Sequence, residues 1–144
     1  MTQVERSALV LHSAEQMFDL VNDVNAYPAF LPWCAATELI SESDTELVAT
    51  LHLAKAGLKY SFTTRNQLQR PSVMELSLVE GPFSQFSGRW DFTPLSDDAC
   101  KVSLNLSFDF AGKLTAMAMS KVFNQVATTL VDAFVQRADQ IYDN

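Results

Sequence analysis

The C-terminal segment of this 144-residue chain constrains its fold more than any other feature. From about Lys113 to Tyr142 there is no glycine or proline, and apolar side chains return at the period of an α-helix. The predicted apolar stripe contains Met119, Phe123, Val126, Ala127, Leu130, Phe134 and Ile141. Arg137 falls in the same stripe, where we expect its stem to pack and its guanidinium to reach water. A long helix with one apolar stripe must bury it against another element.

Runs of alternating apolar and polar residues precede this helix and predict the sheet that covers it. These runs are Leu39–Ser43, Leu47–Lys55, Leu58–Gln69, Val73–Glu80, Phe86–Pro94 and Cys100–Phe110. Short polar or Gly/Pro-containing breaks separate them, as in hairpins. In the clearest run, Leu58, Tyr60, Phe62 and Leu68 alternate with Lys59, Ser61, Thr63, Arg65, Gln67 and Gln69. One face of an antiparallel sheet is therefore predicted to be buried and the other wet.

The N-terminal part adds one strand and a short helical region. Gln3–Leu11 alternates loosely and predicts a first strand. Ser13 and Gln16 have the spacing of a capping box, which predicts a helix of about three turns that runs to Val24. Asn25 and Pro28 end it, and the segment 26–31 allows one more helical turn. We predict an α+β fold, a seven-stranded curved antiparallel sheet wrapped around the C-terminal helix, as a single domain over residues 1–144.

Composition and charge limit the function. Apolar residues make up 48% of the chain, no apolar run is long enough to span a membrane, and the only cysteines are Cys34 and Cys100. We therefore expect a cytoplasmic protein with reduced thiols. The net charge of −7 argues against DNA or general nucleic-acid binding. The segment 47–74 nevertheless has no acidic residue and contains Lys55, Lys59, Arg65 and Arg70. This clustering is either chance or a local surface for an anionic partner.

Catalytic and metal-binding patterns are absent from the sequence. His12 and His52 have no cysteine or carboxylate at ligand spacing, and no phosphate-binding or nucleophile motif occurs. Glu75 is a weak acid–base candidate, because its facing on the strand is ambiguous. A sheet cupped around a helix tends instead to leave an apolar pocket. Tyr60, Thr64 and Asn66 lie on the inward phase of their strand and could hold a carbonyl or hydroxyl of a ligand.

Three segments resemble the coenzyme Q-binding family of START-like (polyketide cyclase-like) helix-grip proteins. They are VNDVNAYPAFLPWC at 21–34, KAGLKYSFTTRNQL at 55–68 and LVEGPFSQFSGRWDFTPL at 78–95, followed by the long helix. The resemblance covers essentially the whole chain and implies the same seven-stranded fold. It also implies that Pro28, Phe30, Leu31, Pro32 and Trp33 form a mobile lip of a tunnel, opposite a loop of Gly81, Pro82 and Phe83.

The resemblance implies two roles. The main hypothesis is a non-enzymatic protein that binds ubiquinone or a similar isoprenoid, without a covalent cofactor, and supports cellular respiration. Its predicted ligand-binding residues are Phe30, Leu31, Trp33, Tyr60, Phe62, Thr64, Asn66, Phe83, Trp90, Phe108, Met119, Phe123 and Leu130. The alternative is a toxin that binds the large ribosomal subunit and blocks subunit joining, through Lys55, Lys59, Arg65 and Arg70. The same four residues could instead meet an anionic surface at the inner membrane. A cyclase or aromatase of the same fold is a lesser alternative.

Overall fold

The computed structural model describes residues 2–142, except for the side chains of residues 113–115. Along the chain the elements are β1 (Thr2–Val10), α1 (Ala14–Asn22), the 3₁₀ turn η1 (Val24–Ala26), α2 (Tyr27–Phe30), β2 (Cys34–Glu42), β3 (Glu46–Lys55), β4 (Leu58–Gln69), β5 (Val73–Glu80), β6 (Phe83–Ser96), β7 (Ala99–Phe110) and α3 (Lys113–Tyr142). The strands form one antiparallel sheet in the order β1-β7-β6-β5-β4-β3-β2.

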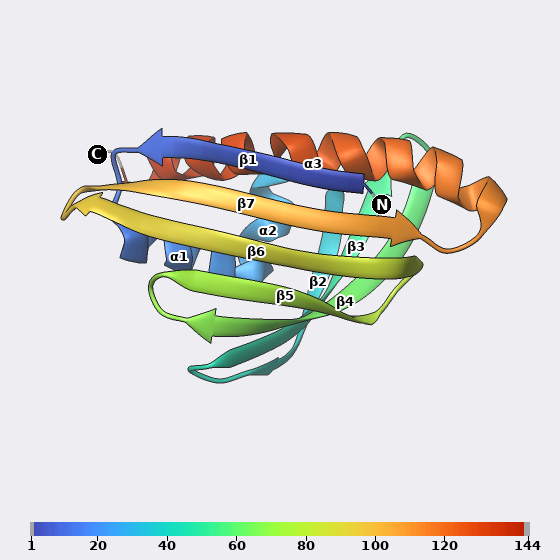
Figure 1. Ribbon diagram of the computed structural model, residues 1–144, viewed down its shortest axis with the longest axis horizontal. Coiled ribbons are helices and arrows are strands. Elements are labelled where there is room, and N and C mark those ends of the chain that lie inside the picture. The colour runs from blue at the N-terminus through green and yellow to red at the C-terminus, as the bar shows by residue number, and fades with distance from the viewer. Residues whose placement is uncertain (1, 143–144) are drawn as a thin grey trace.

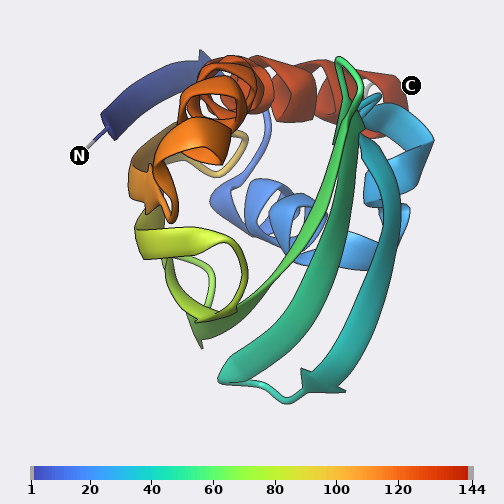
Figure 2. The ribbon, with the colours of Figure 1, turned by 90° about the vertical axis from the view of Figure 1, so that its right-hand side faces the viewer.

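The sheet curls around α3 (Figures 1 and 2). Figure 1 shows α3 running alongside β1 and β7, and Figure 2 shows the sheet curving from β1 round to β2 with α3 across its open side. The short helices α1 and α2 lie at the same side as α3, after β1. The predicted α+β helix-grip fold is confirmed, because both the strand number and the wrapped helix agree with the sequence analysis.

The helical region after β1 forms as local chemistry dictates. Ser13 Oγ accepts a hydrogen bond from the Gln16 amide at 3.1 Å, and Gln16 Oε1 accepts one from the Ser13 amide at 3.0 Å, so the capping box is present. The helix ends earlier than Val24, because Asp23 leaves helical geometry. Pro28 then lies in the first turn of α2, where its missing N–H breaks no helical hydrogen bond.

Several strands have bounds that alternation alone did not predict. β2 begins at Cys34 rather than Leu39, and β6 begins at Phe83 rather than Phe86. Backbone pairing explains both, since Cys34 lies opposite Leu53 and Phe83 lies opposite Phe110. β1 ends at Val10, and Leu11 beyond it is exposed.

The wet face of β4 and the buried stripe of α3 each differ from the prediction at individual residues. Thr63 was expected on the wet face of β4, but it is buried and its hydroxyl lies 2.6 Å from that of Thr50 on β3. A neighbouring strand that supplies a hydrogen-bond partner makes this burial tolerable. Ile141 was expected in the buried stripe of α3, yet it is exposed, while Val131 and Ala138 are buried. The helix packs on β1 and β7 as well as over the concave face, so its buried side is set by more than one contact.

Candidate functional site: an apolar cavity and a basic hairpin

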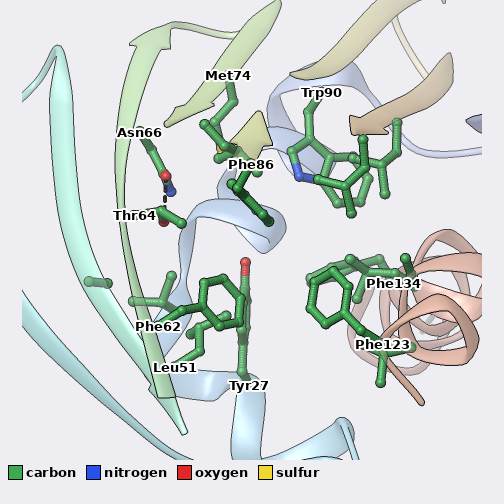
Figure 3. Close-up of a pocket in the computed structure, with 18 of the residues that line it drawn as sticks. Tyr27, Leu51, Phe62, Thr64, Asn66, Met74, Phe86, Trp90, Phe123 and Phe134 are labelled. Atoms are coloured by element: carbon green, nitrogen blue, oxygen red, sulfur yellow. Dashed lines mark hydrogen bonds between the residues drawn. The ribbon is translucent and has the colours of Figure 1, made fainter. Parts of the chain in front are cut away.

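A cavity of about 80 Å³ lies between the concave face of the sheet, α3 and the segment η1–α2 (Figure 3). Its wall consists of Val24, Tyr27, Trp33, Ala49, Leu51, Phe62, Thr64, Asn66, Met74, Leu76, Phe86, Trp90, Leu104, Leu106, Phe123, Val126, Ala127, Leu130 and Phe134. Among the described side chains, no charged one lines it. In Figure 3, Thr64 and Asn66 of β4 face Phe123 and Phe134 of α3 across the open space. A volume of this size is smaller than the ~150 Å³ cavities that bind benzene.

The polar groups of the wall are few, and its hydroxyl groups are paired. Thr64 Oγ1 donates to Asn66 Oδ1 at 2.9 Å, and both side chains are buried. Tyr27 Oη donates to the Val21 carbonyl oxygen. Burial raises the pKa of Tyr27 far above its usual value, with smaller contributions from Cys34 and Asp23, so the phenol stays protonated. The cavity therefore offers neutral hydrogen-bonding groups and no titrating acid–base pair.

The predicted ligand-binding residues divide into two groups in space. Those that line the cavity are Trp33, Phe62, Thr64, Asn66, Trp90, Phe123 and Leu130. Those that lie off its wall are Phe30, Leu31, Tyr60, Phe83, Phe108 and Met119. Whether any of them contacts a ligand stays a prediction. The inward phase of the strands could be read from alternation, but which inward residues border open space depends on how α3 and η1 fill the cup.

The segment expected as a mobile lip is packed through its large side chains, whereas Pro28 and Pro32 are exposed. Leu31 is 1% exposed and Trp33 is 8% exposed. Phe30 is half-buried, with its ring 5.5 Å from that of Phe134, and the Arg137 guanidinium lies over it at 5.2 Å. This contact also explains a charged residue in the apolar stripe of α3.

In the opposing loop Gly81 is exposed and Phe83 is buried. Phe83 is the first residue of β6 and is buried in an aromatic cluster with Phe62, Phe108, Phe110 and Phe123, at ring distances of 4.4 to 6.3 Å. This cluster fills the end of the cup beside the start of α3. The large side chains of the expected lip and of the opposing loop thus pack in the core.

The cavity wall also contains residues that sequence reasoning did not select. They are Val24, Tyr27, Ala49, Leu51, Met74, Leu76, Phe86, Leu104, Leu106, Val126, Ala127 and Phe134. Strand phase could have found several, since Met74 and Leu76 alternate along β5 and Leu104 and Leu106 along β7. Tyr27 had no such signal, because its position depends on how η1 and α2 fold back.

Tyr60 lies beside the cluster rather than in the cavity. Its ring packs edge-on against Phe110 at 5.7 Å, and its hydroxyl is buried without a partner among the described residues. Burial raises the pKa of this phenol well above its usual value. It borders a shallow groove on the sheet with Glu38, Ser61 and Gly81.

The basic residues of segment 47–74 do not form one free surface. Arg65 Nε lies 2.9 Å from Glu46 Oε1, and Arg70 Nη1 lies 3.0 Å from Asp19 Oδ1. Arg70 also stacks over Phe18 at 4.9 Å. The prediction counted charge within the segment alone, whereas the fold brings in carboxylates from outside it. Lys55 and Lys59, at the β3–β4 hairpin, are exposed and have no ion pair within residues 2–142.

The described part of the chain has neither a metal-binding cluster nor an activated thiol. There, no three His, Cys, Asp or Glu side chains are grouped to hold a metal ion. No helix of residues 2–142 is long and apolar enough to cross a membrane. Cys34 and Cys100 are free and buried, and burial raises the pKa of both thiols. A thiol with a raised pKa is a poor nucleophile.

A curved antiparallel sheet closed over an apolar cavity by a long C-terminal helix defines the helix-grip class of domains. The chain belongs to the family described as polyketide cyclase / dehydrase and lipid transport, which matches residues 10–135.

Named relatives cover the whole chain. The sequence is 49% identical over 142 residues to the ribosome association toxin RatA of Vibrio cholerae, with 99% of each chain covered. It is 45% identical to the persistence and stress-resistance toxin PasT of Escherichia coli, over 99% of this chain and 90% of that protein. It is 28% identical to the mitochondrial coenzyme Q-binding protein COQ10 homolog B of Xenopus laevis, over 98% of this chain and 59% of that protein.

Solved structures show the same fold. The Zhui aromatase/cyclase of a Streptomyces species superposes with a TM-score of 0.84 at 20% identity, covering 96% of this chain and 94% of that one. A START superfamily protein of Mycobacterium smegmatis gives 0.80 at 19% identity, covering 96% and 98%. At such low sequence identity, the similarity to a cyclase shows that the fold is shared but does not show that the reaction is shared. The relatives with high identity are named as toxins rather than enzymes, in agreement with the prediction of a non-enzymatic protein.

Proposed function

We propose that this protein associates with the ribosome in the manner of the toxins it resembles, by binding the large subunit and preventing subunit joining. The observation that carries the proposal is the 49% identity to a ribosome association toxin over 99% of both chains. The relative named for coenzyme Q binding is only 28% identical, so the alternative hypothesis of the sequence analysis is favoured over the main one. Such a protein would work in the cytoplasm.

The β3–β4 hairpin is the element that we expect to contact ribosomal RNA. Ala56 and Gly57, both at positive φ, make the tight turn that presents Lys55 and Lys59. Two ammonium groups without protein partners among the described residues can each contact a phosphate. Arg65 and Arg70 would first have to give up Glu46 and Asp19. The acidic remainder of the molecule, with a net charge of −7, opposes binding elsewhere on RNA.

The test is cosedimentation of the purified protein with large ribosomal subunits. Reversing Lys55 and Lys59 to Glu should abolish cosedimentation at physiological salt, because phosphate contacts become repulsions. The control is Lys101→Glu, an exposed lysine on β7 away from the hairpin. With two phosphate contacts, the wild-type log–log salt slope should be about −1.5 to −2, rather than roughly −3 to −4 for four. Unchanged cosedimentation of the hairpin variant would rule out the hairpin as the contact site. Failure of the wild-type protein to cosediment would rule out the ribosome as its partner.

A second function rests on the cavity, which we propose takes an apolar ligand such as an isoprenoid quinone. Its support is a charge-free wall that includes the hydrogen-bonded pair Thr64 and Asn66. At about 80 Å³ the cavity is below the roughly 300–1,000 Å³ of small-molecule sites, so a ligand must displace side chains. Met74 is the member of the wall best suited to move, because its unbranched thioether side chain is adaptable.

The ligand proposal is tested by organic extraction of protein purified from its own host, followed by mass spectrometry. A stoichiometric quinone would support it, and we expect Phe123→Ser or Leu130→Ser to lose that ligand. If no isoprenoid is extracted, the ligand proposal is wrong and the cavity is part of the core. That outcome would not affect the ribosome proposal.

A further inference from the structure

The donors and acceptors of the cavity wall are unequally satisfied. Its polar side chains are Tyr27, Trp33, Thr64, Asn66 and Trp90. The hydroxyls of Tyr27 and Thr64 already donate, to the Val21 carbonyl and to Asn66 Oδ1. The remaining donors are the side-chain N–H groups of Trp33, Asn66 and Trp90, and these have no hydrogen-bond acceptor in the described part of the chain.

All three N–H donors are more than nine-tenths buried, with exposed fractions of 8% for Trp33, 6% for Asn66 and 3% for Trp90. Asn66 and Trp90 are the pair that face each other across the cavity (Figure 3). Neither the Asn66 amide nitrogen nor the Trp90 indole nitrogen donates to an acceptor within the described residues. Within the described residues, the side-chain polar atoms that are fully buried and have no partner are Asn22 Oδ1 and Tyr60 Oη. The Asn66 and Trp90 nitrogens are not among them, so each borders open space, and that space is the cavity. Figure 3 places Asn66 on β4 across the cavity from Trp90, whose nitrogen is on the inward side of its ring.

The electrostatics of the wall restrict what can meet these donors. With no charged side chain on the wall, an ionised ligand would lose its hydration without gaining a counter-charge. A hydrocarbon would leave both N–H groups unpaired, at a cost of about 1–3 kcal/mol each. A neutral carbonyl satisfies an N–H donor and brings no donor of its own.

We propose that the cavity selects neutral apolar molecules that carry a carbonyl acceptor, such as ketones, esters or quinones, through the N–H groups of Asn66 and Trp90. This inference rests on the second function proposed above, because it names the ligand class of that same cavity. Fatty acids and amines are excluded by charge. Asn66 and Trp90 are specificity-determining residues, with Thr64 fixing the amide of Asn66 so that its nitrogen side faces the ligand.

The experiment compares three probes of nearly equal shape, acetophenone, ethylbenzene and benzoate, by NMR titration of ¹⁵N-labelled protein. We expect acetophenone to bind about tenfold or more tightly than ethylbenzene, since each hydrogen bond to a buried donor is worth about a factor of ten. The Trp90 indole N–H signal, assigned with Trp90→Phe, should move downfield with the ketone only. Benzoate should not bind.

Variants separate recognition from simple packing. Asn66→Leu and Trp90→Phe should each reduce the ketone-to-hydrocarbon affinity ratio several-fold, even if hydrocarbon affinity changes little. Gln67→Leu is the matched control, because Gln67 is the exposed neighbour of Asn66 on the same strand and should leave the ratio unchanged. Equal binding of ketone and hydrocarbon, or preferred binding of benzoate, would overturn the selectivity while keeping a ligand cavity. No binding of any probe would overturn both the cavity function and this inference.

Discussion

At the scale of single residues, Gly81 shows why the segment around the start of β6 has the sequence it has. A Cβ at Gly81 would lie 2.6 Å from Phe62 Cβ, inside van der Waals contact. Phe62 cannot retreat easily, because its ring packs on Phe83 at 5.4 Å and Phe123 at 5.9 Å. The glycine therefore lets the β5–β6 connection lie directly on the aromatic cluster.

We predict that Gly81→Ala lowers the free energy of unfolding by about 1–3 kcal/mol, the usual cost of overpacking. Urea denaturation followed by tryptophan fluorescence measures it. Gly57→Ala is the control, since Gly57 has φ +80° but nothing within 4 Å of its would-be Cβ, so it reports backbone strain alone. An equal loss in both variants would mean that the close approach at Phe62 carries no cost.

Cys34 gives a prediction about pH. Burial raises the pKa of its thiol from 9.0 to about 11, although the backbone of Ala36 acts in the opposite direction. Because the native thiol holds its proton more tightly than the unfolded one, its stabilising contribution is complete below the unfolded pKa. That contribution is lost as pH rises from about 9 through 11.

At pH 8, alkylation of native Cys34 by iodoacetamide should be at least about 100-fold slower than in urea, as the thiolate fraction falls tenfold per pKa unit. Mass spectrometry of the modified peptide gives the rate at each cysteine. Rates as fast as in the unfolded chain would contradict the burial of this thiol.

At the scale of elements, α3 is held in two ways. Phe123 anchors its first half among Phe62, Phe83, Phe108 and Phe110, at ring distances of 4.8 to 5.9 Å. Its last turns are tied to the β1–α1 region by polar contacts, from His12 Nε2 to Asp139 Oδ1 at 2.8 Å and from Tyr142 Oη to the Gln16 carbonyl at 3.1 Å.

Phe123→Ala should therefore cost about 3–5 kcal/mol, the range for removing a buried phenyl ring. Met117→Ala on the same helix, where the side chain is 79% exposed, should change the free energy of unfolding by less than about 0.5 kcal/mol. Both follow from urea denaturation curves. A small effect at Phe123 would show that the cluster repacks when its central ring is removed.

At the scale of the whole molecule, the sheet and α3 share one set of buried side chains. Trp90 of β6 packs on Phe92 of β6 and on Phe134 of α3, at 6.1 and 5.5 Å between rings. The sheet cannot bury its concave face without α3, and α3 cannot bury its stripe without the sheet. We therefore propose that the chain is a single domain, as the sequence predicts.

This proposal predicts one cooperative transition in urea, with tryptophan fluorescence and far-UV circular dichroism giving the same midpoint. Trp33 and Trp90 report the cavity, and circular dichroism reports the backbone of all elements. Two separate transitions would mean that the sheet and the helical segments are independent units.

Much of this architecture could be predicted from the sequence because it follows from periodicity and caps. The alternation in Leu58–Gln69, the uninterrupted helix of Lys113–Tyr142 and the capping box at Ser13 are local patterns, and each formed as expected apart from the burial of Thr63. Inward-facing Thr64, Asn66 and Trp90 could be read from strand phase and do line the cavity. Local chemistry is enough for such features, since each depends on neighbours within a few residues.

Only the tertiary structure decided which inward residues border open space and which cations are free. Phe83 and Phe108 face inward as well, yet they fill the core because α3 supplies Phe123 against them. Arg65 and Arg70 belong to the basic segment of the sequence, yet Glu46 and Asp19 approach them in space. A cavity and an ion pair depend on distances between segments that are far apart in the chain. Residue pattern sets the face of each side chain, and packing between elements sets what that face meets.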